Sequence, residues 1–170
     1  NCPEATTITF SAPITIYADI AIMSDTAITL DGADNTSLWI IDVTGALTLD
    51  GLTIQNGVGK TGGAIRNEGK LTLINMILNH NHSELGGVIW NSGTLTIENS
   101  VFDANYAQLG GAIYNQSVLT ILNSTFTDNE ASMTMGDLTK SIGQSDNPQE
   151  SGGAIYNIGS TTITDSRFEN

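Results

Sequence analysis

Short runs of alternating apolar and polar residues fill the chain, and glycine, asparagine, serine or aspartate separates each run from the next. Runs of three to five residues with this alternation are typical of half-buried β-strands and are too short for helices. The pattern Gly-Gly-(Ala/Val)-Ile-x-Asn begins at Gly62, Gly86 and Gly110, a constant period of about 24 residues, and again at Gly152. The last interval equals one period plus an insertion of 18 residues. The sequence therefore predicts an all-β repeat protein.

Two further strand signals hold fixed places in each repeat: a Leu-Thr-Leu-like triplet, and a triplet that ends on Leu or Phe in all four copies. Three short strands per period, without hairpin dipeptides at even spacing, describe one coil of a three-faced solenoid. Equivalent residues of successive coils then lie about 4.8 Å apart. We therefore predict a single-stranded right-handed parallel β-helix of roughly six coils, about 30 Å tall, with one loop insertion.

Residues that recur at one position of the repeat are expected to stack in columns. Each buried apolar side chain contributes about 1.5–3 kcal/mol, and no coil can bury its apolar face alone. The asparagine columns are expected at the bends, where side-chain amides bond one another between coils and tolerate left-handed backbone. The paired glycines are expected in turns. The predicted structural columns are Ile65, Ile89, Ile113 and Ile155; Leu73, Ile97, Ile121 and Ile163; Leu78, Phe102, Phe126 and Phe168; Asn67, Asn91, Asn115 and Asn157; and Asn81, Asn105 and Asn129.

The length fits one domain that spans the whole chain. The segment 27–32 is echoed by 46–51 at an offset shorter than the period, which predicts narrower coils at the start. The insertion breaks the period without adding a coil, so we expect it to leave the rod as a loop, either for recognition or as a tolerated excursion. The predicted parts are irregular first coils over 1–37, regular coils over 38–131, the loop insertion over 132–150 and a last partial coil over 151–170.

Acidic residues outnumber basic ones by 18 to 5, which gives a formal net charge of -13. Such a surface repels nucleic-acid phosphates and anionic lipid headgroups, so we expect no nucleic-acid partner. No run approaches the 18 or so apolar residues of a transmembrane helix, so no membrane insertion is expected. Cys2 is the lone cysteine, either an incidental thiol or a bridge to another chain or segment. No metal or other cofactor is predicted.

The repeats resemble those of the polymorphic outer membrane protein family, first known from chlamydial surface proteins, whose hallmarks are Gly-Gly-Ala-Ile and Phe-x-x-Asn. One copy of the first hallmark has valine in place of alanine, as Gly-Gly-Val-Ile, and Leu78 replaces the aromatic residue in one copy of the second. The resemblance implies a secreted or cell-surface protein with a non-enzymatic structural or adhesive role, because several relatives are adhesins. The hallmarks lie at 62–65, 86–89, 110–113 and 152–155, and at 78–81, 102–105 and 126–129.

Parallel β-helices also include pectin-degrading enzymes, so a fragment of a polysaccharide-active enzyme is one alternative. A lyase needs a base beside clustered carboxylates, but Arg66 and Arg167 lie several coils apart in the repeat. His80 and His82, with Glu84 nearby, make a thin metal site because the repeat places no third ligand there. We therefore predict no catalytic residue.

Binding is the other alternative. If the isoleucine column points inward, alternation turns Arg66, Trp90, Tyr114 and Tyr156 outward along one line. Exposed aromatic side chains on a rigid face suit glycan stacking and protein interfaces. Trp90, Tyr114 and Tyr156 are therefore the candidate ligand-binding residues, with a glycan or protein on a host or neighbouring cell as the partner.

The ends of the rod suggest a different partner. Solenoids normally cover their end strands with a helix or polar cap. The sequence shows no amphipathic helix at either end, and the last coil stops at Asn170. We therefore expect either a fragment of a longer rod or copies that stack end to end into a filament.

Overall fold

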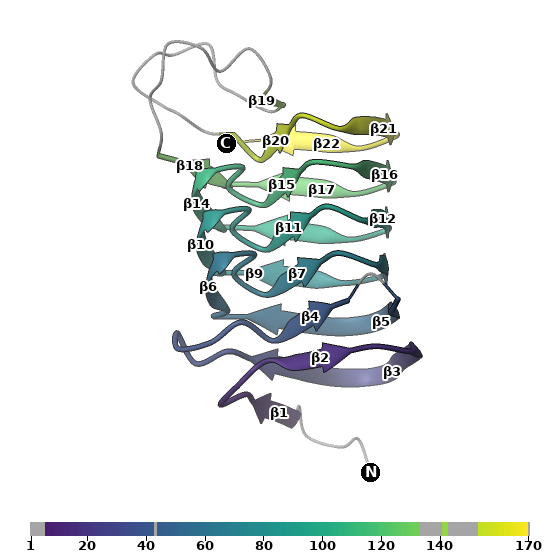
Figure 1. Ribbon diagram of the computed structural model, residues 1–170. Coiled ribbons are helices and arrows are strands. Elements are labelled where there is room, and N and C mark those ends of the chain that lie inside the picture. Colours follow the sequence, from purple (N-terminus) through teal and green to yellow (C-terminus); the bar gives the residue numbers. More distant parts are fainter. Residues whose placement is uncertain (1–5, 43, 133–140, 143–152, 170) are drawn as a thin grey trace.

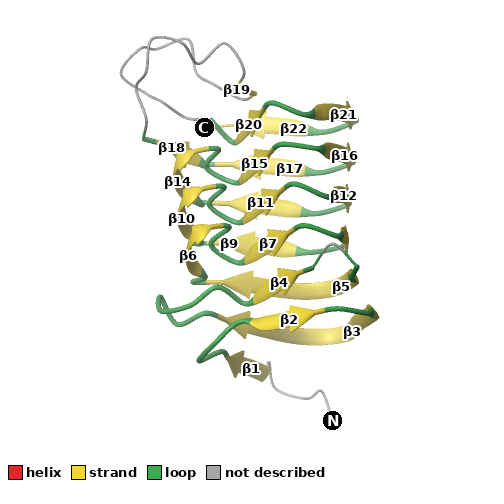
Figure 2. Ribbon diagram, viewed as in Figure 1, coloured by secondary structure: helices red, strands yellow, loops and turns green. Residues whose placement is uncertain are grey.

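The computed structural model describes residues 6–42, 44–132, 141–142 and 153–169, and every regular element in these ranges is a β-strand (Figures 1 and 2). The strands lie across a rod and stack coil upon coil from the N-terminal to the C-terminal end (Figure 1). No helix in the described ranges is long and apolar enough to cross a membrane.

The described strands form three sheets, which we name A, B and C. Sheet A comprises β1 (Thr6–Thr9), β3 (Asp19–Asp31), β5 (Ala46–Gln55), β8 (Lys70–Ile74), β9 (Ile77–Asn79), β12 (Thr94–Glu98), β13 (Val101–Asp103), β16 (Val118–Leu122), β17 (Thr125–Thr127), β21 (Ser160–Thr164) and β22 (Arg167–Glu169). Sheet B comprises β2 (Ile14–Ile16), β4 (Trp39–Ile41), β7 (Ile65–Asn67), β11 (Ile89–Asn91), β15 (Ile113–Asn115), β19 (Ser141–Ile142) and β20 (Ile155–Asn157). Sheet C comprises β6 (Val58–Thr61), β10 (His82–Leu85), β14 (Tyr106–Leu109) and β18 (Glu130–Ala131).

Neighbouring strands in each sheet come from successive coils and run parallel. Ile89 of β11 pairs with Ile65 of β7 on one side and with Ile113 of β15 on the other. The exception among the described strands is β19, which pairs antiparallel with β20. The three faces, the spacing of about 24 residues and the parallel β-helix, with about five turns in the described part, confirm the predicted fold class.

The interior is built from the predicted apolar columns. The side chains of Ile65, Ile89, Ile113 and Ile155 are 0% exposed and lie one coil apart. The rings of Phe102 and Phe126 stack with centroids 4.6 Å apart, which is close to the strand spacing of a sheet. Each ring therefore covers the next, and the hydrophobic core is continuous along the rod.

Each regular coil contains four strands instead of the predicted three. The strands of sheet C gave no signal because their inward side chains are small or polar, such as Ser83 and Ala107. Ser83 is buried, and its hydroxyl donates to the carbonyl of Gly86 at 2.8 Å. A strand that packs through small residues lacks the apolar alternation on which the prediction depended.

The expectation of narrower coils at the start holds only for the first pairing, in which Thr6 of β1 lies beside Ile28 of β3, 22 residues away, and it is wrong for the next coil. Ile28 of β3 pairs with Leu52 of β5, one full period away, although the sequence echo suggested Leu47 as its partner. Asp19 pairs with Ala46, an offset longer than the period, and the register shifts between Met23 and Ile28. The first coils are therefore irregular through the register shift in β3, and the parallel pairing fixes their width.

Two sequence predictions concern residues that lie mainly outside the described ranges. The loop insertion over 132–150 lies outside the described residues, apart from Ser132 and the short strand β19. Cys2 also lies outside them.

Candidate binding face and the ladders behind it

An asparagine ladder lies inside sheet B. Nδ2 of Asn67 donates to Oδ1 of Asn91 at 2.6 Å, Asn91 donates to Asn115 at 2.6 Å, and Asn115 donates to Asn157 at 2.7 Å. The first three of these side chains are 0% exposed. The second amide hydrogen reaches a backbone carbonyl, as in the bond from Asn67 to Thr94 at 3.1 Å. The ladder satisfies buried polar groups in the manner of stacked amides in cross-β structures.

A second ladder lies at the bend before sheet C. Oδ1 of Asn105 accepts the backbone N–H of Asn81 at 2.9 Å and its Nδ2 at 3.0 Å. Oδ1 of Asn129 accepts the backbone N–H of Asn105 at 3.2 Å and its Nδ2 at 2.8 Å. Each amide therefore caps the backbone of the coil below, so this ladder joins coils through both side chain and main chain.

The ladder asparagines, which could tolerate left-handed backbone, do not adopt it, and the left-handed residues lie beside these ladders. Positive φ is found instead at Asn75, Asn99 and Asn123, between the two strand runs of sheet A. Gly62, Gly86 and Gly110 also have φ between 66° and 70°, as expected for turn glycines. The residues that follow Asn99 and Asn123 form a third, serine ladder, in which the N–H of Ser100 donates to Oγ of Ser124 at 3.1 Å.

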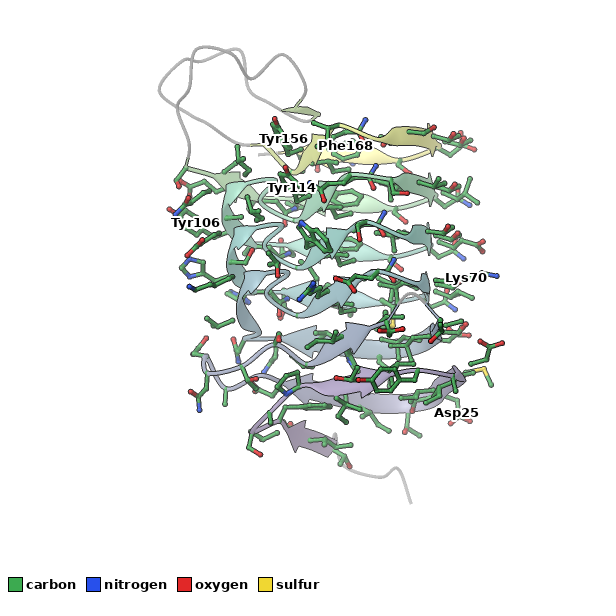
Figure 3. All side chains as sticks on the ribbon, viewed as in Figure 1. Asp25, Lys70, Tyr106, Tyr114, Tyr156 and Phe168 are labelled. Carbon is green, nitrogen blue, oxygen red and sulfur yellow. The ribbon has the colours of Figure 1, made fainter. Side chains whose placement is uncertain are left out.

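The four outward residues of sheet B lie in one column. Trp90 pairs with Arg66 of the preceding coil and with Tyr114 of the following coil. Tyr114 pairs in turn with Tyr156, which lies directly above it (Figure 3). Trp90 and Tyr156 are half-buried, whereas Tyr114 is 9% exposed. In the coil below Arg66 the column continues as Ile40. The regular coils thus carry a line of one cation and three aromatic rings, which we call the aromatic column.

Ring geometry decides what the aromatic column offers to a ligand. The rings of Tyr114 and Tyr156 are stacked, with centroids 5.1 Å apart and planes inclined by 16°. The guanidinium carbon of Arg66 lies 5.5 Å from the centroid of the Trp90 ring, a cation–π contact. Because the two tyrosine rings cover each other along the rod, the ring faces between them are closed to a ligand. Ligand binding by these residues stays a prediction.

Sheet C presents an aromatic pair that the sequence reading missed. His82 of β10 pairs with Tyr106 of β14, and the two rings meet edge to face at 4.9 Å. In Figure 3, Tyr106 lies at the lateral edge of the rod, away from Tyr114. The spacing of His82 and Tyr106, which are one period apart, could have indicated this pair, but no strand was expected at these positions. Within the described ranges, no three His, Cys, Asp or Glu side chains are grouped closely enough to hold a metal.

The basic residues considered for catalysis are engaged in local pairs. Arg66 forms an ion pair with Glu68, and Arg167 forms one with Glu169. The hollow of about 270 Å³ beside Lys70 on sheet A has one acidic residue in its lining, Asp19. These positions give no paired carboxylates of the kind that glycoside hydrolysis uses.

Asp31 at the end of β3 forms a polar cluster that the sequence did not indicate. It accepts hydrogen bonds from Nε2 of Gln55 at 2.8 Å, from the N–H of Ala33 at 2.7 Å and from Nδ2 of Asn56 at 3.2 Å. Burial raises the pKa of Asp31, but these three hydrogen bonds outweigh burial and hold the pKa below its ordinary value of 3.8. The cluster links the first coils to the regular ones.

Comparison with known proteins identifies one repeat. Residues 123–158 match the family model of the Chlamydia polymorphic membrane protein repeat. The matched segment contains the hallmarks at 126–129 and 152–155, so the sequence resemblance is confirmed. No curated protein and no solved structure matches the chain.

Proposed function

Because residues 123–158 carry the repeat of the Chlamydia polymorphic membrane proteins, we propose that this chain is a non-catalytic extracellular module that adheres to a protein on another cell through its aromatic column. The repeat family and the parallel β-helix fit a β-helix module of a surface protein. The adhesive role, the protein partner and the extracellular location are the proposal.

The observation that carries the proposal is the contrast between inward and outward positions of sheet B. Inward, the regular coils repeat the same isoleucine and asparagine at every level. Outward, they present Arg66, Trp90, Tyr114 and Tyr156, the residue types that are enriched in protein interfaces and their hot spots. A rigid core with fixed spacing thus holds these side chains in order at low entropic cost.

The ring geometry favours a protein partner over a glycan. Glycan stacking needs an exposed ring face, but Tyr114 and Tyr156 cover each other and Tyr114 is 9% exposed. Ring edges and phenol hydroxyls suit contacts with the carbonyls and side chains of a protein surface. Carbohydrate binding is therefore the alternative that the test must separate.

Self-association by end-to-end stacking meets an obstacle in sheet B. At the C-terminal end of the rod, β19 occupies the outer edge of β20 by antiparallel pairing (Figure 1). A second copy that continued sheet B in parallel would have to displace β19. A lateral face, which needs no such displacement, is therefore the better site of attachment.

Bead attachment tests the proposal. Fluorescent beads coated with the chain are applied to cultured epithelial cells and to bacterial cells, with albumin-coated beads as background. We expect attachment to at least one cell type, and a loss of about tenfold for the double variant Trp90→Ala/Tyr156→Ala, as for truncation of central interface aromatics. The control Thr72→Ala/Thr120→Ala changes outward residues of sheet A and should leave attachment unchanged.

Enzymatic treatment of the cells identifies the partner's chemistry. Protease treatment should abolish attachment if the partner is a protein. Attachment that survives protease but is lost after glycosidase treatment would contradict the protein partner and favour a glycan. Attachment at the albumin background, or equal attachment by the wild-type chain and the double variant, would contradict the adhesive role of the column. Release of unsaturated products from pectin or alginate would contradict the non-catalytic assignment.

A further inference from the structure

The dipeptide Asn56–Gly57 lies where the first coils meet the regular ones. Asn56 directly follows β5 and has a φ of 53°, and Gly57 is buried. Asn-Gly is the sequence most prone to spontaneous deamidation, because glycine has no side chain to hinder attack by its own backbone nitrogen. Asparagine is also among the thermolabile residues that very stable proteins avoid.

Packing between coils explains why this reactive pair is present. Left-handed backbone at position 56 favours asparagine. A Cβ on Gly57 would lie 2.5 Å from the carbonyl oxygen of Gly63 and 2.9 Å from the Cα of Ala64. Position 57 therefore accepts only glycine without movement of the neighbouring backbone.

The same packing engages the atoms that deamidation needs. The backbone N–H of Gly57, the nucleophile, donates to Oδ1 of Asn81 in the next coil at 2.9 Å. Nδ2 of Asn56, the leaving nitrogen, donates to the two carboxylate oxygens of Asp31 in the preceding coil at 3.2 and 3.3 Å. Asn81 is 1% exposed, so water does not compete for its oxygen.

We infer that Asn56–Gly57 is a latent deamidation site that the stacked coils hold closed. When the coils separate, the Gly57 nitrogen attacks Cγ of Asn56 and forms a new N–C bond. The Cγ–Nδ2 bond breaks, and Nδ2 leaves as ammonia with the proton that the Gly57 nitrogen has lost. The resulting succinimide takes up one water and opens to aspartate or isoaspartate. The reaction needs no oxidant, metal or enzyme, and it does not depend on the proposed adhesive function.

Deamidation would weaken the attachment of the first coils. A carboxylate at position 56 replaces a donor to Asp31 by a second negative charge at hydrogen-bond distance. The backbone around it joins the two regions, because Asp34 N–H donates to the carbonyl of Asn56 at 2.9 Å and Val58 N–H donates to that of Thr36 at 3.1 Å. The modification is irreversible, so it would mark chains in which the coils on both sides of Asn56–Gly57 have separated.

Peptide mapping by mass spectrometry tests the inference. The intact chain is incubated in mildly alkaline buffer, folded or unfolded in urea, and deamidation at Asn56 is measured over time. We expect the folded chain to react at least about tenfold more slowly than the unfolded chain, since the site must open first. Equal rates would overturn the inference.

Two variants show whether Asn81 is the protecting group. Asn81→Ala removes the acceptor of the Gly57 N–H and should raise the Asn56 rate about tenfold. Asn129→Ala removes the equivalent amide two coils further on, where it caps Asn105 instead, and should change the Asn56 rate by less than about twofold. Equal acceleration by both variants would overturn the assignment to Asn81.

Hydrogen exchange supplies a measurement that needs no variant. The Gly57 amide of the wild-type chain should be protected, and its opening should account for the slow deamidation. Exchange at the rate of an unfolded peptide would overturn the inference even if Asn81→Ala does not fold.

Asn56→Asp mimics the product and should increase exchange in β3 at neutral pH, whereas Asn99→Asp, at an exposed left-handed asparagine of the regular coils, should not.

Discussion

The regular coils and the first coils share a backbone arrangement but differ in their side-chain ladders. Between β7 and β17, register partners are one period apart and the asparagine columns are continuous, whereas the serine and phenylalanine columns begin one coil later, at Ser100 and Phe102. In the first coils, Ile41 occupies the level below Asn67, so the ladder of sheet B ends there. Oδ1 of Asn67 is accordingly buried without a hydrogen-bond partner.

An aromatic pair without counterpart in the repeat lies in the first coils. Trp39 is 4% exposed and points inward at the level below Ile65, where it meets Phe10 edge to face at 5.5 Å. Ile8 and Ile14, in contrast, are 48% and 46% exposed. Parallel pairing therefore tolerates a non-repeating sequence, whereas the ladders require the same residue in consecutive coils.

The largest effect is expected from breaking the phenylalanine stack. Phe102→Ala removes a 0% exposed ring that packs on Phe126, so we expect the free energy of unfolding to fall by about 3–5 kcal/mol. Phe10→Ala in the first coils removes a partly buried ring and should cost clearly less. Urea unfolding followed by circular dichroism compares the two. Equal losses would show that the first coils are as tightly packed as the regular ones.

An interruption in the middle of the sheet B ladder should have the next largest effect. Asn91→Ala removes the acceptor of Asn67 and the donor to Asn115 and the carbonyl of Val118. Buried groups left unpaired predict a loss of about 1–3 kcal/mol in the free energy of unfolding. Ser92→Ala, at the adjacent turn, is the matched control and should change stability by less than about 0.5 kcal/mol. An Asn91→Ala chain as stable as this control would mean that the ladder contributes no net stability.

Two alanines in left-handed backbone allow a smaller, stabilising test. Ala104 in the regular coils and Ala33 in the first coils have φ of 50° and 53°. Replacement by glycine relieves the contact of Cβ with the backbone, which should stabilise the chain by about 1 kcal/mol at Ala104. The gain at Ala33 should be smaller in global unfolding if the first coils open before the rest. Midpoints of urea unfolding measure both, and a larger gain at Ala33 would contradict the order of opening.

The smallest effect concerns the charge of Asp31. Its pKa is lowered in the folded chain, so the ionised carboxylate stabilises the first coils above the ordinary value of 3.8, and this stabilisation is lost as the pH falls through the lower folded pKa. Asp31→Asn should therefore speed hydrogen exchange of the Gly32 amide at neutral pH but not in acid. A difference of the same size at both pH values would exclude the charge as the cause.

Repetition explains which features of the fold could be predicted. Ile65, Ile89 and Ile113 recur at a constant interval, and a column of identical residues has one stable arrangement, directly above one another. The strands of sheet C were missed because Ser83 and Ala107 carry no apolar signal. The short echo of 27–32 in 46–51 misled because alternation alone does not fix the register of a strand whose pairing shifts partway along it.

The candidate face was predicted only in part. Alternation placed Trp90, Tyr114 and Tyr156 outward, and their residue types suggested binding. The stacking of the two tyrosine rings depends on rotamers and on the distance between coils, which a linear pattern does not contain. The same holds for the pairing of His82 with Tyr106.

The period, the parallel β-helix and the inward columns follow from the amino-acid sequence alone, because an apolar residue that recurs once per period can be buried only by its own repeats. Tertiary structure decided the width of the first coils, the left-handed positions and the environment of Asn56 and Asp31. These depend on contacts between residues of different type in adjacent coils, such as Gly57 with Asn81, and no repeat in the sequence announces such contacts.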